Sequence, residues 1–440
     1  MKLPQTVENC MTRLESAGFA CFAGGGCVRD WLMGLQPHDY DLCTAATPGQ
    51  IRAVFADHGL VLAGEKHGTV GVITDGGVVE ITTFRTEEGY ADNRHPDHVA
   101  FVSDVTADLA RRDFTVNAMA WSPTRGLVDP FGGQTDLEQK ILRAVGDSWA
   151  RFREDSLRIL RGVRFAVRFR LEPEEKTLGA MKELAPLMDN LARERVFDEL
   201  CKLLPLCGAE DLLRYEPILS RAVPELAPLV GFRQHSRHHA YDVYTHTAHV
   251  TGAVPPELSL RWAALLHDTG KPATFTRDDR GEGHFYGHAR VSADLAEEAL
   301  RRLKAPNQLR EEVVRLVELH MTRIPPEKKS VRRWLGRLGE QTLNRLMALQ
   351  EADMGSKGTG MPAESAQFGE IRRLAAEIQA ENACLTLKDL AVNGRDLMAL
   401  GLTGKAVGQA LNELLEQVMD ERLPNEKTAL LQAVKNKIHG

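Results

Sequence analysis

The chain reads FAGGGCVRDWLMGLQPHDYDLCTAATP over residues 22–48, a stretch in which a glycine turn and an arginine precede two aspartates. The aspartates are spaced as Asp39-Tyr40-Asp41. Because alternate residues of a strand project from the same face, this spacing directs both carboxylates to one point. Two hard oxygen donors suit Mg²⁺, which proteins bind through one or two carboxylates together with substrate phosphates. We therefore predict that Asp39 and Asp41 hold catalytic magnesium.

The residues around this pair suit a bound triphosphate. Gly25 and Gly26 lack side chains, so backbone N–H groups can approach phosphate oxygens, and Arg29 is close enough to add a bidentate donor. An isolated Asp-x-Asp is more often a solvated turn, and these neighbours are what favour a metal site. As third carboxylate we expect Glu80 on a predicted strand, with Asp113 as its competitor; the alternative for either is a capping or ion-paired acid.

Bulk composition narrows the classes of protein. The length of 440 residues predicts three or four folding units, with the 43% hydrophobic and 26% charged residues of an ordinary globular protein. Seven scattered cysteines without a CxxC pair indicate reduced thiols. No stretch approaches the ~20 apolar residues of a membrane span, so we expect a cytoplasmic protein with no membrane partner. The net charge of −6 argues against general coating of nucleic acid.

The secondary-structure pattern changes near residue 150. Short β-rich runs and glycine turns come before it, whereas three-to-four-residue apolar spacing typical of helices continues after it to the end. Proline- and glycine-rich segments suggest further boundaries. We predict an α+β fold with four parts, at residues 1–145, 146–222, 223–360 and 361–440.

Five motifs, in order along the chain, resemble those of class II CCA-adding enzymes and their poly(A) polymerase relatives. After residues 22–48 they are RRDFTVNAMA (111–120), DPFGG (129–133), EDSLRILR (154–161) and the ERxxxE pattern at 194–199. The resemblance implies a polymerase-β-like nucleotidyltransferase head with a mixed sheet, an all-α neck and a helical tRNA-binding tail. It also implies that Arg112 contacts the nucleotide, and that the partners are tRNA, CTP and ATP rather than DNA.

Residues 142–170 hold eight arginines against three acids, and they contain a candidate for base selection. On a helix, Asp155 and Arg158 lie one turn apart, and Arg161 and Arg164 continue the ridge. A carboxylate accepts and a guanidinium donates, which matches the amino group and ring nitrogen of cytosine and adenine but opposes guanine and uracil. Two mismatched contacts at ~1–3 kcal/mol each discriminate roughly thirtyfold to 10⁴-fold or more. The alternative is an ion-paired solvent face or an RNA-backbone track.

Nine of the fifteen histidines lie between residues 235 and 320. Within them, RWAALLHDTGKP (261–272) resembles the HD phosphohydrolase family, whose ligand pattern is matched, on predicted helices, by His246, His267, Asp268, His288, His320 and Asp353. Such ligands suit Ni²⁺, Mn²⁺, Fe²⁺ or Zn²⁺, which can activate water near neutral pH. The resemblance implies hydrolysis of phosphomonoesters or 2′,3′-cyclic phosphates. For the other five histidines we expect surface or core roles, the commoner case for a single histidine.

Several alternatives stay open. Within the family, the chain is a full CCA-adding enzyme, an A-only adding enzyme or a poly(A) polymerase. Residues 85–96 resemble the flexible loop of full CCA enzymes, which disfavours CC-only addition. Two alternatives come from other classes of protein. One is an HD signalling hydrolase with a non-catalytic nucleotide-binding head, and the other is a non-catalytic RNA-binding protein. Neither explains the presence of Asp39 and Asp41.

Overall fold

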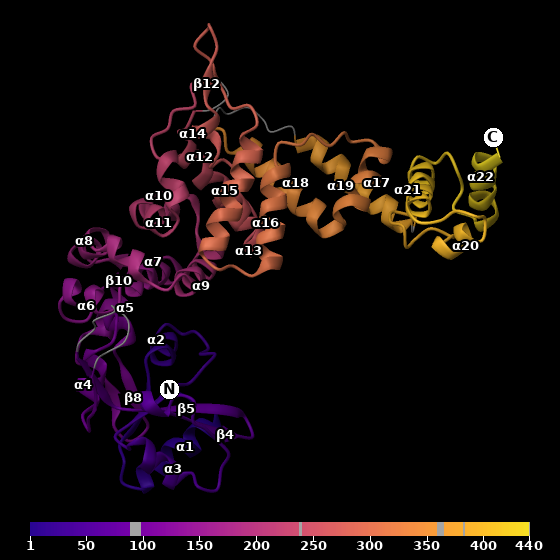
Figure 1. The fold of residues 1–440 in the computed structure, drawn as a ribbon. Helices are drawn as coiled ribbons and strands as arrows, with labels where there is room; N and C mark the ends of the chain where they lie inside the picture. The colour runs from indigo at the N-terminus through magenta and orange to yellow at the C-terminus, as the bar shows by residue number, and fades with distance from the viewer. Residues whose placement is uncertain (89–97, 237–239, 359–364, 382, 440) are drawn as a thin grey trace. The chain divides into compact units, whose positions relative to one another are not determined.

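The computed structural model describes the chain except residues 89–97, 237–239, 359–364, 382 and 440 (Figure 1). The chain divides into two compact units, Met1–Cys207 with Asp211–Ala227 and Gly208–Glu210 with Pro228–Gly440. All seven cysteines are free thiols, as expected. Within the described ranges, no helix has the length and hydropathy that a membrane crossing requires.

A seven-stranded mixed sheet forms the head of the first unit, in the order β3-β4-β5-β2-β1-β8-β9. Its strands are β1 (Cys21–Gly24), β2 (Leu42–Thr44), β3 (Leu60–Val61), β4 (Thr69–Thr74), β5 (Gly77–Thr83), β8 (Ala120–Ser122) and β9 (Gly126–Val128). Within the described residues of this sheet, β2 and β5 are the one parallel pair, with Leu42 opposite Ile81. Gly77 turns β4 into β5 with a φ of 110°, a conformation that favours glycine. The order places β2 and β5, which border the predicted metal site, side by side.

Helices cover the sheet through an apolar core. The helices of the head are α1 (Gln5–Ser16), α2 (Gly26–Leu32), α3 (Pro48–Val54), α4 (Val105–Ala110) and α5 (Gly133–Glu138). Val7, Met11 and Leu14 of α1 pack with Ile51 of α3 and Ile81 of β5, and Figure 1 shows α1 and α3 close together. A second small sheet pairs β6 (Arg85–Glu88) with β7 (His98–Phe101).

The remainder of the first unit is helical. Its helices are α6 (Ser148–Glu154), α7 (Leu157–Phe169), α8 (Glu175–Glu183), α9 (Arg193–Leu203) and α11 (Glu216–Ala222), with a two-residue ladder of β10 (Ile141–Leu142) and β11 (Glu172–Pro173). Short 3₁₀ helices are η1 (Glu65–His67) and η2 (Thr115–Asn117) in the head, and η3 (Ala185–Asn190) and η4 (Leu204–Leu206) after it. A last one, η5 (Pro224–Leu229), begins in the first unit and ends in the second. Phe165 of α7 packs edge-on against Phe114, with ring centroids 5.9 Å apart. This contact fixes α7 against the head.

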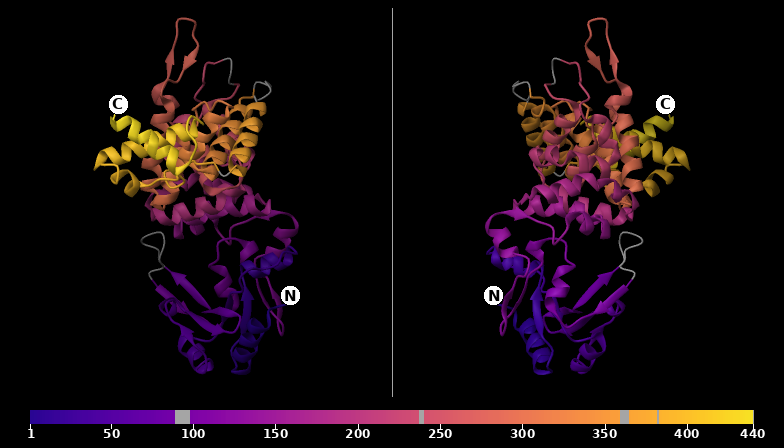
Figure 2. Two further views of the ribbon diagram at one scale, coloured as in Figure 1. Left: turned by 90° about the vertical axis from the view of Figure 1, so that its right-hand side faces the viewer. Right: turned by 90° about the vertical axis from the view of Figure 1, so that its left-hand side faces the viewer.

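The described residues of the second unit form helices and one short hairpin. Its helices are α12 (Val243–Ala253), α13 (Leu258–Leu266), α14 (Lys271–Thr274), α15 (His288–Arg302), α16 (Asn307–Leu319), α17 (Lys328–Leu338), α18 (Glu340–Gly355), α19 (Ser365–Ala380), α20 (Gly394–Met398), α21 (Lys405–Met419) and α22 (Lys427–His439). The residues of α10 (Ala209–Arg214) are divided between the two units. The hairpin of β12 (Thr276–Arg277) and β13 (Gly283–His284) projects from these helices (Figure 2). A small core around Leu397, Leu414 and Leu430 holds the last helices together.

The predicted α+β fold, a mixed-sheet head followed by helices, is confirmed. Strand structure after residue 150 is limited, among the described residues, to β11 and the β12–β13 hairpin. The division into four parts stays a prediction.

Candidate active sites

A cavity of about 740 Å³ lies in the first unit, lined by residues of β2, β5, α2 and α7. We call it the N-terminal cavity. Every residue that the sequence predicted for nucleotidyl transfer lines it, namely Gly26, Arg29, Asp39, Asp41, Glu80, Arg112, Asp155, Arg158, Arg161 and Arg164. Segments far apart in the sequence therefore meet at one place.

The three predicted metal ligands share one part of this cavity, but the expected strand geometry is wrong. Strand β2 begins only at Leu42, so Asp39 and Asp41 lie in the preceding loop. The reason is that the partner strand β1 ends at Gly24, whose N–H donates to the Asp41 carbonyl at 3.0 Å, and the chain then turns into α2. Glu80 does lie on strand β5, as predicted.

The charges of these acids suit a divalent cation. Loss of solvation in the cavity raises the pKa of Asp41, and the negative charges of Glu80 and then Asp39 raise it further, although Arg112 opposes them. Carboxylates that repel one another in this way are stabilised when a cation lies among them. Asp39, Asp41 and Glu80 therefore fit Mg²⁺ by their chemistry.

The glycine turn lies directly beneath an arginine. Gly25 has a φ of 72°, and a Cβ there would overlap the Arg112 guanidinium. Nη1 of Arg112 is 3.4 Å from the Asn117 carbonyl oxygen, and Nη2 is 3.6 Å from a carboxylate oxygen of Asp108. A cation is thus held over backbone that has no side chains, which suits an approaching phosphate.

Arg29, in contrast, is engaged by the protein. The residue is 5% exposed. Its guanidinium donates to the Asp30 carboxylate at 2.6 and 2.9 Å and to Asn117 Oδ1 at 2.5 Å, and it lies 4.2 Å from the ring centre of Phe169. Burial lowers its pKa. In this structure Nε and Nη2 of Arg29 both donate to Asp30 Oδ1, and contact of Arg29 with a triphosphate stays a prediction.

The base-selecting pair also differs from its predicted geometry. Asp155 precedes α7 instead of lying on it, with φ −140° and ψ 102°, and its carboxylate accepts the Leu157 N–H at 3.0 Å. An aspartate at a helix start caps free N–H groups, and this local bond outcompetes helical backbone. The Asp155 carboxylate pairs with Arg195 at 2.8 Å, and Arg158 pairs with Glu154 at 2.9 Å. The two side chains nevertheless line one cavity.

The rest of the ridge is held by two acids: Asp113, for which the sequence left an ion-paired role open, and Glu199, to which the sequence gave no role. Arg161 donates to Asp113 at 2.7 Å and Arg164 to Glu199 at 2.6 Å. Burial alone would raise the pKa of Asp113, but Arg161 and Asn117 lower it to about 2. Arg195 and Glu199 belong to the ERxxxE pattern, and the spacing of acids and arginine in this pattern is the sequence feature that could have indicated their contacts. Their contacts identify the pattern as a support for the arginines.

These contacts separate the two candidates for third carboxylate. We expect Glu80→Gln to lower kcat for nucleotide addition at least about tenfold, equivalent to 1.36 kcal/mol in the barrier, without loss of stability. Asp113→Asn instead destabilises the first unit by about 2 kcal/mol at pH 7, because its pKa falls from 3.8 to about 2 on folding.

The pH dependence checks this assignment. The Asp113 contribution is complete above pH 4 and declines as the pH falls toward 2, so in urea denaturation the gap to wild type narrows between pH 6 and pH 3. If Glu80→Gln keeps its activity while Asp113→Asn is stable but inactive, the assignment of Glu80 as the third carboxylate is wrong.

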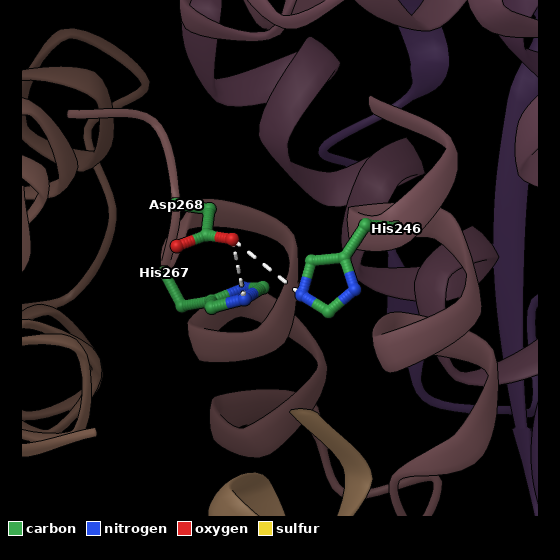
Figure 3. A group of neighbouring side chains, drawn as sticks. All are labelled: His246, His267 and Asp268. Carbon is green, nitrogen blue, oxygen red and sulfur yellow. Dashed lines mark ion pairs between the residues drawn. The ribbon is translucent and has the colours of Figure 1, made fainter. Parts of the chain in front are cut away.

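A second site lies among the helices of the second unit. Its residues, which we call the His–Asp cluster, are the six predicted ligands His246, His267, Asp268, His288, His320 and Asp353. Figure 3 shows His246 and His267 beside the Asp268 carboxylate, with Nε2 distances to Oδ2 of 3.5 and 3.2 Å. From the other side, the Nε2 atoms of His288 and His320 lie 3.4 and 3.9 Å from Asp268 Oδ1. His246 Nε2 is 2.9 Å from Asp353 Oδ1.

The predicted helical placement of this cluster holds only in part. His246, His288 and Asp353 lie on α12, α15 and α18. His267 and His320 directly follow the last residues of α13 and α16, and Asp268 lies in the turn after α13. Side chains at helix ends can point along the helix axis, which is why these three reach the centre of the cluster.

The ring orientation suits a metal ion. Nδ1 of each histidine faces a backbone carbonyl oxygen, at 3.2 Å for His246, 2.7 Å for His267, 2.8 Å for His288 and 2.6 Å for His320. A carbonyl only accepts, so Nδ1 carries the proton and the Nε2 lone pairs face inward. The Nε2 atoms of His288 and His320 are 3.2 Å apart, and Nε2 of His267 is buried with no hydrogen-bond partner.

Charge in the cluster agrees with this orientation. Burial lowers the pKa of His320 to about 4, and the charge of His267 contributes to the shift, so its ring is neutral at pH 7. Burial would raise the pKa of Asp268, but His267 and Lys271 hold it well below its usual value. Lys271 Nζ lies 2.7 Å from Asp268 Oδ2 and 2.8 Å from Gln234 Oε1. Burial would lower the pKa of His267, but the negative charge of Asp268 raises it, so a metal ion that binds this ring displaces its proton. The cluster therefore offers a neutral imidazole at His320 and an ionised carboxylate at Asp268.

Family models match three segments of the chain. The Poly A polymerase head domain matches residues 21–143. An RNA and SrmB-binding site of polymerase A matches residues 170–229, and tRNA nucleotidyltransferase domain 2 matches residues 285–434.

Whole proteins match as well. The chain is 32% identical to the CCA-adding enzyme of Streptococcus mutans over 97% of this chain and 96% of that protein. It is 42% identical to the CCA-adding enzyme of Pediococcus pentosaceus in a match that covers 53% of this chain and 59% of that protein. Among solved structures, that of the Bacillus stearothermophilus CCA-adding enzyme in complex with CTP matches with a TM-score of 0.72 at 27% identity, covering 100% of this chain and 98% of that one.

Proposed function

Because the chain belongs to the family of CCA-adding enzymes and is thus a tRNA nucleotidyltransferase, we propose that its N-terminal cavity adds C, C and A to the 3′ end of tRNA. CTP and ATP are the nucleotide donors, and pyrophosphate is released. The observation that carries the proposal is the meeting of Asp39, Asp41 and Glu80 with the arginines of α7 in one cavity. We infer that this reaction takes place in the cytoplasm.

The two parts of the cavity have separate tasks. Asp39, Asp41 and Glu80 would hold Mg²⁺ next to the reacting phosphate. When bound, magnesium supplies activation of the attacking 3′ hydroxyl and charge stabilisation of the leaving pyrophosphate. The guanidinium of Arg112, above the glycine turn at Gly25, binds and orients the triphosphate.

Base selection uses groups that the protein already orients. Arg195 and the Leu157 N–H fix the Asp155 carboxylate, which retains lone pairs for an amino group of cytosine or adenine. Glu154 and the Arg111 carbonyl fix Arg158, whose five N–H donors exceed those contacts. Donors and acceptors held in advance need little reorganisation when the correct base binds, and a wrong base leaves them unpaired.

Arg158→Ala is expected to lower the preference for C and A over U and G roughly five- to 150-fold, the value of one polar contact at ~1–3 kcal/mol. Steady-state incorporation of each nucleotide into tRNA measures this preference. Arg153→Ala is the matched control, because Arg153 is an exposed arginine of α6 outside the lining of the N-terminal cavity. Unchanged selectivity in Arg158→Ala removes the selecting role of this residue.

We propose a second activity for the His–Asp cluster, the hydrolysis of phosphomonoesters or 2′,3′-cyclic phosphates. The supporting observation is the set of four imidazole Nε2 atoms that face Asp268 and Asp353. Ni²⁺, Mn²⁺, Fe²⁺ or Zn²⁺ fits this donor set and, when bound, supplies water with a lowered pKa for attack on phosphorus. Backbone carbonyls fix the imidazole rings, and Lys271 neutralises part of the Asp268 charge. Metal-stimulated hydrolysis by the purified chain tests the proposal.

A further inference from the structure

A cavity of about 660 Å³ connects the His–Asp cluster to the β12–β13 hairpin. Asp268, His288 and Asp353 line one part of it, and His284 and Tyr286 line another. Any phosphate at the cluster therefore shares its cavity with two aromatic rings.

The two rings form a stacked pair, with centroids 5.4 Å apart and an angle of 12° between their planes. The side of the pair formed by Tyr286 is open, since this residue is 77% exposed. His284 Nε2 lies 3.1 Å from Asp278 Oδ2, and Asp278 Oδ1 accepts the N–H groups of Arg280 and Glu282 at 2.9 Å each. The hairpin thus holds His284, and His284 supports the tyrosine ring from behind. We call the pair the aromatic platform.

Tyr286 and the cluster are also close along the chain. His288 follows Tyr286 by two residues, so the Cα atoms of these two residues lie at most ~7 Å apart. That is the scale of the ribose that separates a nucleobase from its phosphate. A base on the platform and a phosphate at the cluster can accordingly belong to one nucleotide.

We propose that the aromatic platform stacks the base of a nucleoside phosphate whose phosphate lies at the His–Asp cluster. The inference rests on the proposed hydrolase activity and narrows its substrates to nucleotides and RNA ends. A single exposed tyrosine on a surface needs no explanation. Tyr286 differs because it is stacked, supported by a fixed histidine and placed in the same cavity as the candidate ligands. Stacking accepts any base, so no particular base is selected.

The kinetic test compares Tyr286→Ala and Tyr286→Phe with wild-type full-length protein and Mn²⁺. The substrates are guanosine 2′,3′-cyclic phosphate and glycerol 2-phosphate, which has no base; guanosine is used because the N-terminal cavity is expected to reject it. Tyr286→Ala is expected to raise KM for the guanosine substrate roughly five- to 150-fold with kcat unchanged. In Tyr286→Phe, which keeps the aromatic ring, KM is expected to equal that of the wild type. Hydrolysis of glycerol 2-phosphate stays the same. Equal effects on both substrates, or none on the guanosine substrate, overturn the proposal.

A binding measurement separates this inference from the hydrolase proposal. Calorimetric titration with guanosine 3′-monophosphate is expected to give a Kd that rises by the same factor in Tyr286→Ala and returns in Tyr286→Phe. If the protein binds the nucleotide in a way that depends on Tyr286 but hydrolyses no substrate, the platform proposal is supported and the hydrolase proposal is rejected. Hydrolysis of glycerol 2-phosphate with no effect of Tyr286→Ala on either measurement rejects the platform and retains the hydrolase. A protein that neither binds nor hydrolyses rejects both.

Discussion

Replacement of Asp41 by asparagine is expected to reduce the rate of tRNA 3′ extension about a thousandfold or more. The carboxylate would hold the magnesium that stabilises developing charge, a contribution of several kcal/mol, and each 1.36 kcal/mol in the barrier is tenfold in rate. An amide has no charge and cannot replace this ligand. Single-turnover addition of CMP to tRNA lacking its terminal CCA measures the loss.

The stability of the same variant shows whether the loss is chemical. Loss of solvation and the negative charge of Glu80 raise the pKa of Asp41, so its charge is unfavourable in the folded protein without a cation. Asp41→Asn therefore leaves the melting temperature unchanged or raises it. Asp75→Asn, at an exposed aspartate outside the lining of the N-terminal cavity, makes the same chemical change and keeps full activity. Extension by Asp41→Asn at the wild-type rate excludes Asp41 as a metal ligand.

His267→Ala is expected to abolish metal-stimulated phosphate hydrolysis and to weaken transition-metal binding by at least about a hundredfold. Losing a group that only orients a metal ligand costs 10- to 100-fold, and loss of the ligand itself costs more. Nε2 of His267 is buried, makes no hydrogen bond and lies 3.2 Å from Asp268 Oδ2, so a metal ion between the two groups would take both as ligands. Metal titration and hydrolysis of 2′,3′-cyclic nucleotides measure the two effects.

A matched substitution isolates this role. His249 lies on α12 outside the His–Asp cluster and stacks on Tyr241 at 4.8 Å, so His249→Ala keeps both metal binding and hydrolysis. CCA addition stays intact in both variants, because the N-terminal cavity contains neither histidine. A wild-type protein that is inactive with Ni²⁺, Mn²⁺, Fe²⁺ and Zn²⁺ rules out the hydrolase activity.

The sequence was sufficient to predict which residues come together. Short motifs with fixed spacing contain Asp39, Asp41 and Arg158, and each of these residues lines the N-terminal cavity. The resemblance of residues 261–272 to the HD phosphohydrolase family likewise implied six ligands, which converge in the second unit. Such motifs combine chemistry-bearing side chains with the glycines and helix ends that orient them, so their residue types carry spatial information.

Local geometry was less predictable, because it depends on partners distant in sequence. The Asp-x-Asp spacing suggested a strand, but β1 ends at Gly24 and its ladder with β2 begins only at Leu42. Asp155 fits a helical pattern, but its side chain caps the next helix.

The acids that hold the arginines were missed for the same reason. Glu199 pairs with Arg164 across 35 positions, and Asp30 takes the guanidinium of Arg29. The aromatic platform had no sequence signal at all, since neither His284 nor Tyr286 belongs to a recognised pattern. A pairing of this kind becomes visible only when the hairpin and the cluster are seen in one cavity.

Sequencing of tRNA 3′ ends tests CCA addition most directly. Purified protein is incubated with Mg²⁺, CTP, ATP and tRNA that ends at the discriminator base, and the product ends are read. We predict the addition of C, C and A followed by termination. Long A tails indicate a poly(A) polymerase, a single added A indicates an A-only enzyme, and either result, or no extension, contradicts the proposed function.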